Sequence, residues 1–324
     1  MTTLAPVEVD GFVVRAGFIG DQAYFATGEG AVVLIGSGQN EVRPHKAGLL
    51  AAEEMPGRKA LLTSGDDGRI VRIAPDGSFE MMAERPRKWI DMIACGPSGA
   101  IAFASGRTAW VRLADGKENE FSHERAVGGI AFAPKGMKLA VGRYDGATIW
   151  WANATGKPQE LPWKGAHLGV TFSPDGKYLV SSMQENAMHG WRLSDVQDMR
   201  MTGYPSKVKS WSWSVKGRYL ATSGATAAIV WPFFGKTGPM GQTPLQLGTR
   251  GDSLVTCVAC HPKEEVAAVG YADGMVLMCR FEDNAEVLLR RAGQGPVSSL
   301  AWDDAGVRLA FGTEEGEAGI VSLM

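Results

Sequence analysis

The chain has 324 residues, of which 42 are glycine, and 45% of its residues are hydrophobic. This composition excludes a disordered chain, and the absence of a three-residue glycine period excludes collagen. Thirty-three basic residues stand against 35 acidic ones, for a net charge of −2, which disfavours nucleic-acid binders with a clear basic excess.

The N-terminal residues and the number of cysteines indicate the cellular compartment. The first ten residues contain neither a basic segment nor an apolar segment of the secretory type, and no apolar run reaches the ~18 residues of a membrane span. Four cysteines are too few for a disulfide scaffold. We therefore expect a cytoplasmic protein with reduced thiols and no membrane contact.

A strand pattern repeats along the chain, after an extended apolar-alternating segment at Leu4–Val9. Each repeat opens with apolar residues at the first, fourth and sixth places and with Pro and Gly at the eighth and tenth, as in the segment Val127–Gly136. A short run of small and apolar residues follows, and alternation with Asp-Gly turns predicts antiparallel strands. Eight such runs occur, at residues 24–27, 60–63, 102–105, 139–142, 179–182, 220–223, 267–270 and 309–312. Third strands are expected at 70–73, 110–113, 148–151, 229–231, 276–278 and 320–323.

Three segments carry a family resemblance: Phe-Ser-Pro-Asp-Gly at Phe172–Gly176, the opening His123-x-x-x-Val127, and the Leu-Ala run that ends in Asp-Gly at Gly146. With them, the chain resembles WD40 β-propellers along essentially its whole length. The resemblance implies an all-β fold, a single closed propeller of four-stranded blades over residues 1–324. It implies that residues 1–9 complete the last blade and that residues 10–324 form the blades. Eight second-strand runs predict eight blades, and seven is the alternative because residues 11–42 match least well.

The departures from the family concern its buried His–Ser/Thr–Asp–Trp network. Trp151 and Trp231 hold the Trp place, but no Asp follows either of them. In the unit of His123 and Asp145, the place of the hydroxyl falls on Val141. We therefore expect incomplete networks, with stability coming mainly from aromatic packing between sheets by Phe132, Phe172, Trp211, Trp213 and Trp302.

Sequence motifs for chemistry are scarce. There is no Gly-x-Ser-x-Gly, no phosphate-binding loop and no pair of histidines at zinc-ligand spacing, so we expect no enzyme, no cofactor and no metal. The string Cys257-Val-Ala-Cys260-His261 matches a haem-attachment motif. Cys260 falls at the aromatic core place and Cys257 has the opposite strand parity, so a structural role is expected. A haem and a redox or metal pair are the alternatives.

Two surfaces are candidates for partner binding. The resemblance implies that, as in WD40 propellers, the loops before first strands and the turns between second and third strands share one rim. Aromatic and cationic residues there have the composition of binding hot spots, and a merely solvated rim is the alternative. The predicted rim site is Lys88, Trp89, Arg125, Arg143, Tyr144, Lys207 and Tyr271.

The second surface is the insertion at residues 231–244, rich in Gly and Pro. Here Phe233, Phe234 and Met240 are predicted to form an exposed protein contact, with a loop folded over its own blade as the alternative.

These features favour a non-catalytic scaffold, monomeric on its own, that binds a protein or peptide of unknown identity. An enzyme or small-ligand propeller with a central-channel site is the second hypothesis, and RNA binding on a local basic-aromatic rim is the third. The channel candidates are His45, His123, His167, Arg125 and Asp91.

Overall fold

The computed structural model describes residues 2–154, 156–235 and 237–323, and these form an all-β propeller of antiparallel sheets. The chain divides into two compact units, Pro44–Gly203 and the combination of Met1–Arg43 with Tyr204–Met324. We call Pro44–Gly203 the middle unit and the other the terminal unit. Two single 3-10 turns, η1 (Pro56–Arg58) and η2 (Pro97–Gly99), interrupt the strands.

The middle unit contains two four-stranded sheets and one six-stranded sheet. Their strands follow one another in chain order, as the alternating runs predict. The strands are β6 (Leu49–Glu54), β7 (Leu61–Gly65), β8 (Arg69–Ile73) and β9 (Phe79–Glu84); β10 (Met92–Cys95), β11 (Ile101–Ser105), β12 (Thr108–Arg112) and β13 (Glu118–Ser122); and β14 (Val127–Phe132), β15 (Lys138–Trp151), β16 (Gln159–Phe172), β17 (Tyr178–Met183), β18 (Met188–Arg192) and β19 (Gln197–Met201).

The six-stranded sheet holds two repeat units. Strand β15 turns back on itself at Asp145 and Gly146, which both have positive φ, and Ala152 N donates to Met137 O (2.8 Å) across the resulting hairpin. The first half of β16 pairs with β15, and its second half pairs with β17. Strand β16 is therefore the fourth strand of one unit and the first strand of the next.

The terminal unit contains four four-stranded sheets. Its strands are β2 (Val13–Ile19), β3 (Gln22–Thr27), β4 (Val32–Ile35) and β5 (Gln39–Val42); β20 (Trp211–Trp213), β21 (Tyr219–Thr222), β22 (Ala228–Pro232) and β23 (Leu245–Leu247); β24 (Val255–Cys260), β25 (Val266–Tyr271), β26 (Val276–Arg280) and β27 (Glu286–Arg290); and β28 (Val297–Trp302), β29 (Arg308–Thr313), β30 (Ala318–Leu323) and β1 (Thr2–Val7).

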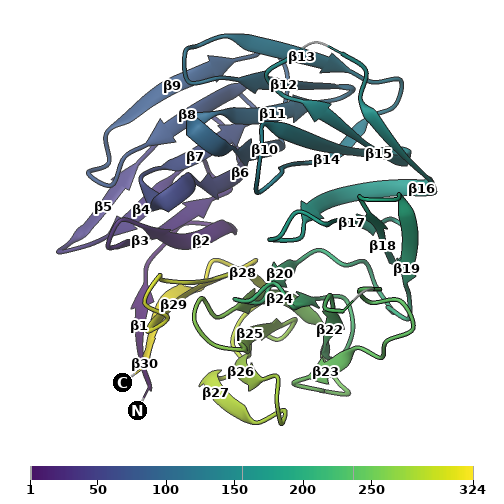
Figure 1. Cartoon of the computed structure of the whole chain (residues 1–324). Helices are drawn as coiled ribbons and strands as arrows, with labels where there is room; N and C mark the ends of the chain where they lie inside the picture. The colour runs from purple at the N-terminus through teal and green to yellow at the C-terminus, as the bar shows by residue number, and fades with distance from the viewer. Residues whose placement is uncertain (1, 155, 236, 324) are drawn as a thin grey trace. The chain divides into compact units, whose positions relative to one another are not determined.

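The N-terminal strand completes the last sheet, as predicted. Strand β1 pairs antiparallel with β30, from Thr2 opposite Leu323 to Val7 opposite Ala318. Figure 1 shows the purple β1 alongside the yellow β30. The first and last residues of the described chain are thus hydrogen-bonded neighbours in one sheet.

The blade count needs a correction. All eight predicted second-strand runs lie on strands, namely β3, β7, β11, β15, β17, β21, β25 and β29. Counted by sheets, however, the described residues form seven blades, the alternative, and not eight. The two counts differ because β16 runs unbroken through the junction of two repeat units, so these units share one sheet.

Second strands supply much of the core. Tyr24, Phe25 and Phe103 on β3 and β11 are fully buried, because a strand in the middle of a sheet is covered on both faces. Of the aromatic residues predicted to dominate the packing, Phe172 and Trp302 are buried. The remaining three are only half-buried, which corrects that part of the prediction: Phe132, Trp211 and Trp213.

Candidate functional site

The loops that precede first strands lie against the turns between second and third strands in the middle unit. Val127 N donates to Gly106 O (2.8 Å) and His123 N donates to Arg107 O (2.9 Å), which join loop 123–126 to the turn at 106–107. We call the loops 85–90 and 123–126, together with the turns 105–107 and 143–146, the loop edge of the middle unit. Five of the seven predicted rim residues belong to it.

A cleft of about 390 Å³ opens at the loop edge. Arg143 makes an ion pair with Glu160 and donates to Tyr144 O (3.2 Å), so its guanidinium is held in place. Arg125 is exposed and has no ion-pair partner among the residues that the structure describes. The structure therefore brings two of the predicted cations into one cleft, one anchored and one available. The cleft is lined by Ser122, His123, Glu124, Arg125, Arg143, Thr148, Trp150, Pro158 and Glu160.

A hydrogen-bonded network supports the cleft. Trp150 Nε1 lies 3.2 Å from His123 Nε2 and 3.1 Å from Thr148 Oγ1. Because an indole N–H only donates, His123 Nε2 accepts and carries no proton. Burial lowers the pKa of His123 below its ordinary value, which favours the same neutral form. The cleft thus has a rigid, uncharged imidazole beneath its arginines.

This network corrects the predicted assignment of its members. The hydroxyl belongs to Thr148 and not to Val141, and the indole belongs to Trp150 and not to Trp151. Since successive strand residues face opposite sides, placing Trp150 toward His123 turns Trp151 away from it, and Trp151 is 55% exposed. Two consecutive tryptophans were the signal in the sequence, because only one can face the network.

The exposed aromatics of the loop edge are Trp89 and Tyr144. Trp89 is 69% exposed and Tyr144 is 47% exposed, and both are large apolar side chains that the core does not use. Lys88 lies beside Trp89 in the chain and places its Nζ 5.8 Å above the ring of Trp110. These three residues stay available to a partner.

The two predicted rim residues of the terminal unit differ from each other. Lys207 is exposed. Tyr271 is fully buried, and its hydroxyl donates to Gly248 O. The prediction that Tyr271 contacts a partner is wrong, because this last residue of β25 faces the core beside Leu277 and Cys279.

The insertion packs on its own sheet. Phe233 is buried, with its ring 4.8 Å from the ring of Trp213 in an edge-on arrangement. Phe234 is half-buried, 5.5 Å from the ring of Tyr219, and Met240 is half-buried too. The structure thus corrects the predicted exposure of Phe233 and favours the alternative, a loop folded over its blade.

Of the channel candidates, the three histidines make structural hydrogen bonds, whereas Asp91 and Arg125 are exposed. His45 is buried and lies 3.1 Å from Asp67 Oδ1 and 3.0 Å from Thr63 Oγ1, and burial lowers its pKa. His167 is buried with Ser181 Oγ at 2.7 Å. In the described part of the chain, no group of three His, Cys, Asp or Glu side chains could hold a metal ion.

The cysteine motif lies on β24. Cys257 packs in a cluster with Val297 and Leu300, whereas Cys260 packs against the cluster on the other face of the strand. Cys260 Sγ lies 3.3 Å from Ser212 O, and burial raises its pKa to about 12. Sulfurs on opposite faces do not fit one haem, and the arrangement matches the predicted parity.

Comparison with known proteins identifies the fold alone. No family model matches the chain, and no curated protein matches it either. Among solved structures, the chain is similar to the computationally designed Ika8 protein, with a TM-score of 0.79, 16% sequence identity and coverage of 98% of each chain. In the described residues, no helix is long and apolar enough to span a membrane.

Proposed function

We propose that the chain is a non-catalytic scaffold that binds a protein or peptide at the loop edge of its middle unit. The observation that carries the proposal is the cleft in which exposed Arg125 lies with the anchored Arg143. An arginine fork binds carboxylates well, and arginine with exposed aromatics is the composition of binding hot spots. Trp89 and Tyr144 supply such aromatics on the same edge.

Membership of the WD40 class is part of the proposal. His45, Thr63 and Asp67 form three members of the hydrogen-bonded network that the family uses, in a unit that lacks the tryptophan. In another unit, Tyr204 takes the place of the histidine, with its hydroxyl 2.7 Å from Thr222 Oγ1 and 2.6 Å from Trp231 Nε1. As part of the same proposal, the protein is a cytoplasmic monomer that acts by binding its partner.

The enzyme hypothesis has less support. A general acid or base needs a reachable group with a suitable pKa, whereas His45 and His167 are buried, have lowered pKa values and are already hydrogen-bonded. RNA binding would call for a cationic surface, and at the loop-edge cleft Glu124 and Glu160 accompany the two arginines.

The test is quantitative partner capture from native cell extract with a triple variant, Arg125→Glu, Trp89→Ala and Tyr144→Ala. If the loop edge binds, Trp89→Ala alone should cost about 2 kcal/mol of binding free energy. The control triple, Lys216→Glu, Val215→Ala and Val307→Ala, has the same charge change and alters exposed residues of the terminal unit. Equal partner abundance for both folded triples would exclude the loop edge as the binding site.

A further inference from the structure

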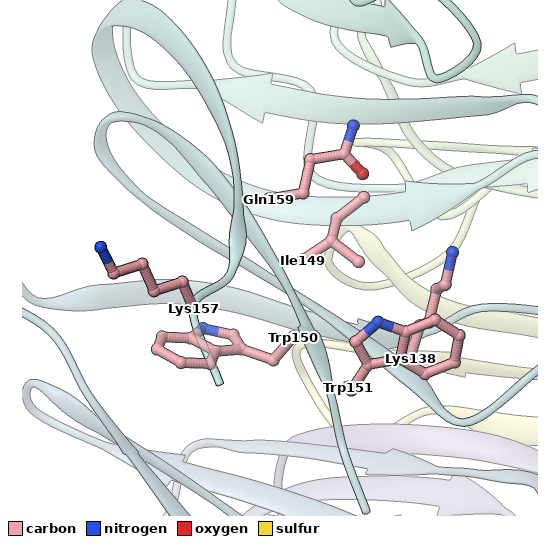
Figure 2. Close-up of a pocket in the computed structure, with 6 residues that line it drawn as sticks. All are labelled: Lys138, Ile149, Trp150, Trp151, Lys157 and Gln159. Atoms are coloured by element: carbon pink, nitrogen blue, oxygen red, sulfur yellow. The ribbon is translucent and has the colours of Figure 1, made fainter. Parts of the chain in front are cut away.

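A second surface lies on the opposite face of the same segments of β15 and β16 that line the loop-edge cleft, because alternate strand residues face opposite sides. Two clefts of about 200 and 190 Å³ share Lys138, Ile149 and Gln159, which makes them parts of one groove on β15 and β16. Figure 2 shows the part that contains both tryptophans, with their rings on opposite sides of the strand. We call this surface the lysine groove, and define it by Lys135, Lys138, Ile149, Trp151, Lys157 and Gln159.

Three cations line the lysine groove without a carboxylate partner. Lys135, Lys138 and Lys157 make no ion pair with any residue that the structure describes. The carboxylate among the described lining residues is Asp175, which is already bound by Lys177 Nζ at 2.9 Å and Ser173 Oγ at 2.7 Å. The groove therefore carries unbalanced positive charge, although the whole chain has a net charge of −2.

The groove also offers apolar surface. Trp151 is 55% exposed, and Lys138 Nζ lies 4.7 Å above its ring, so a cation is held on the face of an aromatic side chain. Buried Ile149 and Phe172 and half-buried Leu193 form the apolar floor of the groove. An exposed tryptophan that the core does not use, beside unpaired lysines, has the chemistry of a binding surface.

We propose that the lysine groove binds an acidic polypeptide segment that carries an apolar side chain. Carboxylates of the segment pair with Lys135, Lys138 and Lys157, and the apolar side chain lies against the exposed ring of Trp151. Charge complementarity identifies the occupant as acidic, and the apolar lining favours a polypeptide over a nucleic-acid backbone. None of the six residues that define the lysine groove lines the loop-edge cleft, so its occupancy does not depend on the proposed function above.

The experiment uses the full chain and two labelled peptides. The probe has four glutamates, two leucines and four more glutamates, and its partner has glutamines in place of the glutamates. Fluorescence anisotropy is measured at about 25 and 150 mM salt, because paired surface charges weaken with ionic strength. We expect the glutamate peptide to bind and the glutamine peptide not to bind. The glutamate peptide should bind more weakly at the higher salt concentration.

Variants locate the binding. The double variant Lys138→Glu, Lys157→Glu should weaken binding by about tenfold or more, and Trp151→Ala by about fivefold. Lys216→Glu with Lys263→Glu matches the charge change at exposed positions elsewhere, and Phe79→Ala removes another exposed aromatic. These controls should change the affinity less than about twofold.

Three results would overturn the proposal. The first is no binding of the glutamate peptide at low salt, and the second is equal loss in the lysine double variant and its control. The third is tighter, lysine-dependent binding of a labelled oligouridine, which would assign the groove to nucleic acid instead. Circular dichroism confirms that each variant is folded before its affinity is compared.

Discussion

His189 is a buried imidazole whose environment opposes its charge. Both ring nitrogens are buried without a hydrogen-bond partner in the described chain, and the ring of Trp163 stacks on it with centroids 4.0 Å apart. Burial lowers the pKa of His189 from 6.5 to about 3, helped by His167 and Arg200 nearby. Between about pH 3 and pH 6.5, His189 is therefore neutral in the folded protein and protonated in the unfolded chain.

The effect on stability has a definite sign. Because the folded pKa lies below the unfolded one, the contribution is complete above about pH 6.5 and is lost as the pH falls toward 3. At about 1.4 kcal/mol per pKa unit, acidification from pH 7.5 to pH 4 should lower the free energy of unfolding by about 3 kcal/mol through this residue alone.

Two substitutions isolate this contribution. His189→Phe keeps an aromatic ring against Trp163 and removes the titration, so its free energy of unfolding should fall about 3 kcal/mol less than that of the wild type between pH 7.5 and pH 4. His189→Gln also removes the titration. It loses the ring that stacks on Trp163 and buries two N–H donors and a carbonyl in place of one donor and one acceptor, so it should be less stable than wild type at pH 7.5.

The free energy of unfolding of the wild type and both variants is measured by urea titration, followed by tryptophan fluorescence, at pH 7.5, 5.5 and 4. If His189→Phe retains the full pH dependence of the wild type, the imidazole is not held neutral in the folded state and the reasoning fails.

Deleting residues 1–9 should expose the edge of β30 and lower the melting temperature, with aggregation visible by light scattering; an unchanged monodisperse protein would contradict the closing role of β1. Phe233→Ala should cost about 3–4 kcal/mol of unfolding free energy because the ring is buried on Trp213, and half-buried Phe234→Ala should cost less; equal, small losses in urea titrations would argue for an exposed loop. Tyr204→Phe leaves Trp231 Nε1 and Thr222 without the hydroxyl and should cost about 1–3 kcal/mol, which thermal unfolding would detect; a neutral result would mean that the bonds contribute little.

Local patterns in the sequence determined the strands and their succession. Alternating residues and Asp-Gly turns are short-range signals, so all eight second-strand runs could be predicted, whereas the pairing partner of the N-terminal segment was expected from the resemblance to WD40 propellers. The loop-edge positions of Trp89, Arg125 and Tyr144 followed from the same register, since residues outside the strand pattern fall in the connecting loops.

The tertiary structure decided which face of each strand is covered. Alternation states that Trp150 and Trp151 face opposite sides, but the neighbouring His123 and Thr148 determine which ring is buried. Tyr271 is the last residue of β25, and the sequence placed it in the turn that follows. Only its contacts with residues of other strands show that it belongs to the core. The shared sheet at β16 depends on hydrogen bonds to β15 and β17, and backbone pairing between segments leaves no residue-type signature in the sequence.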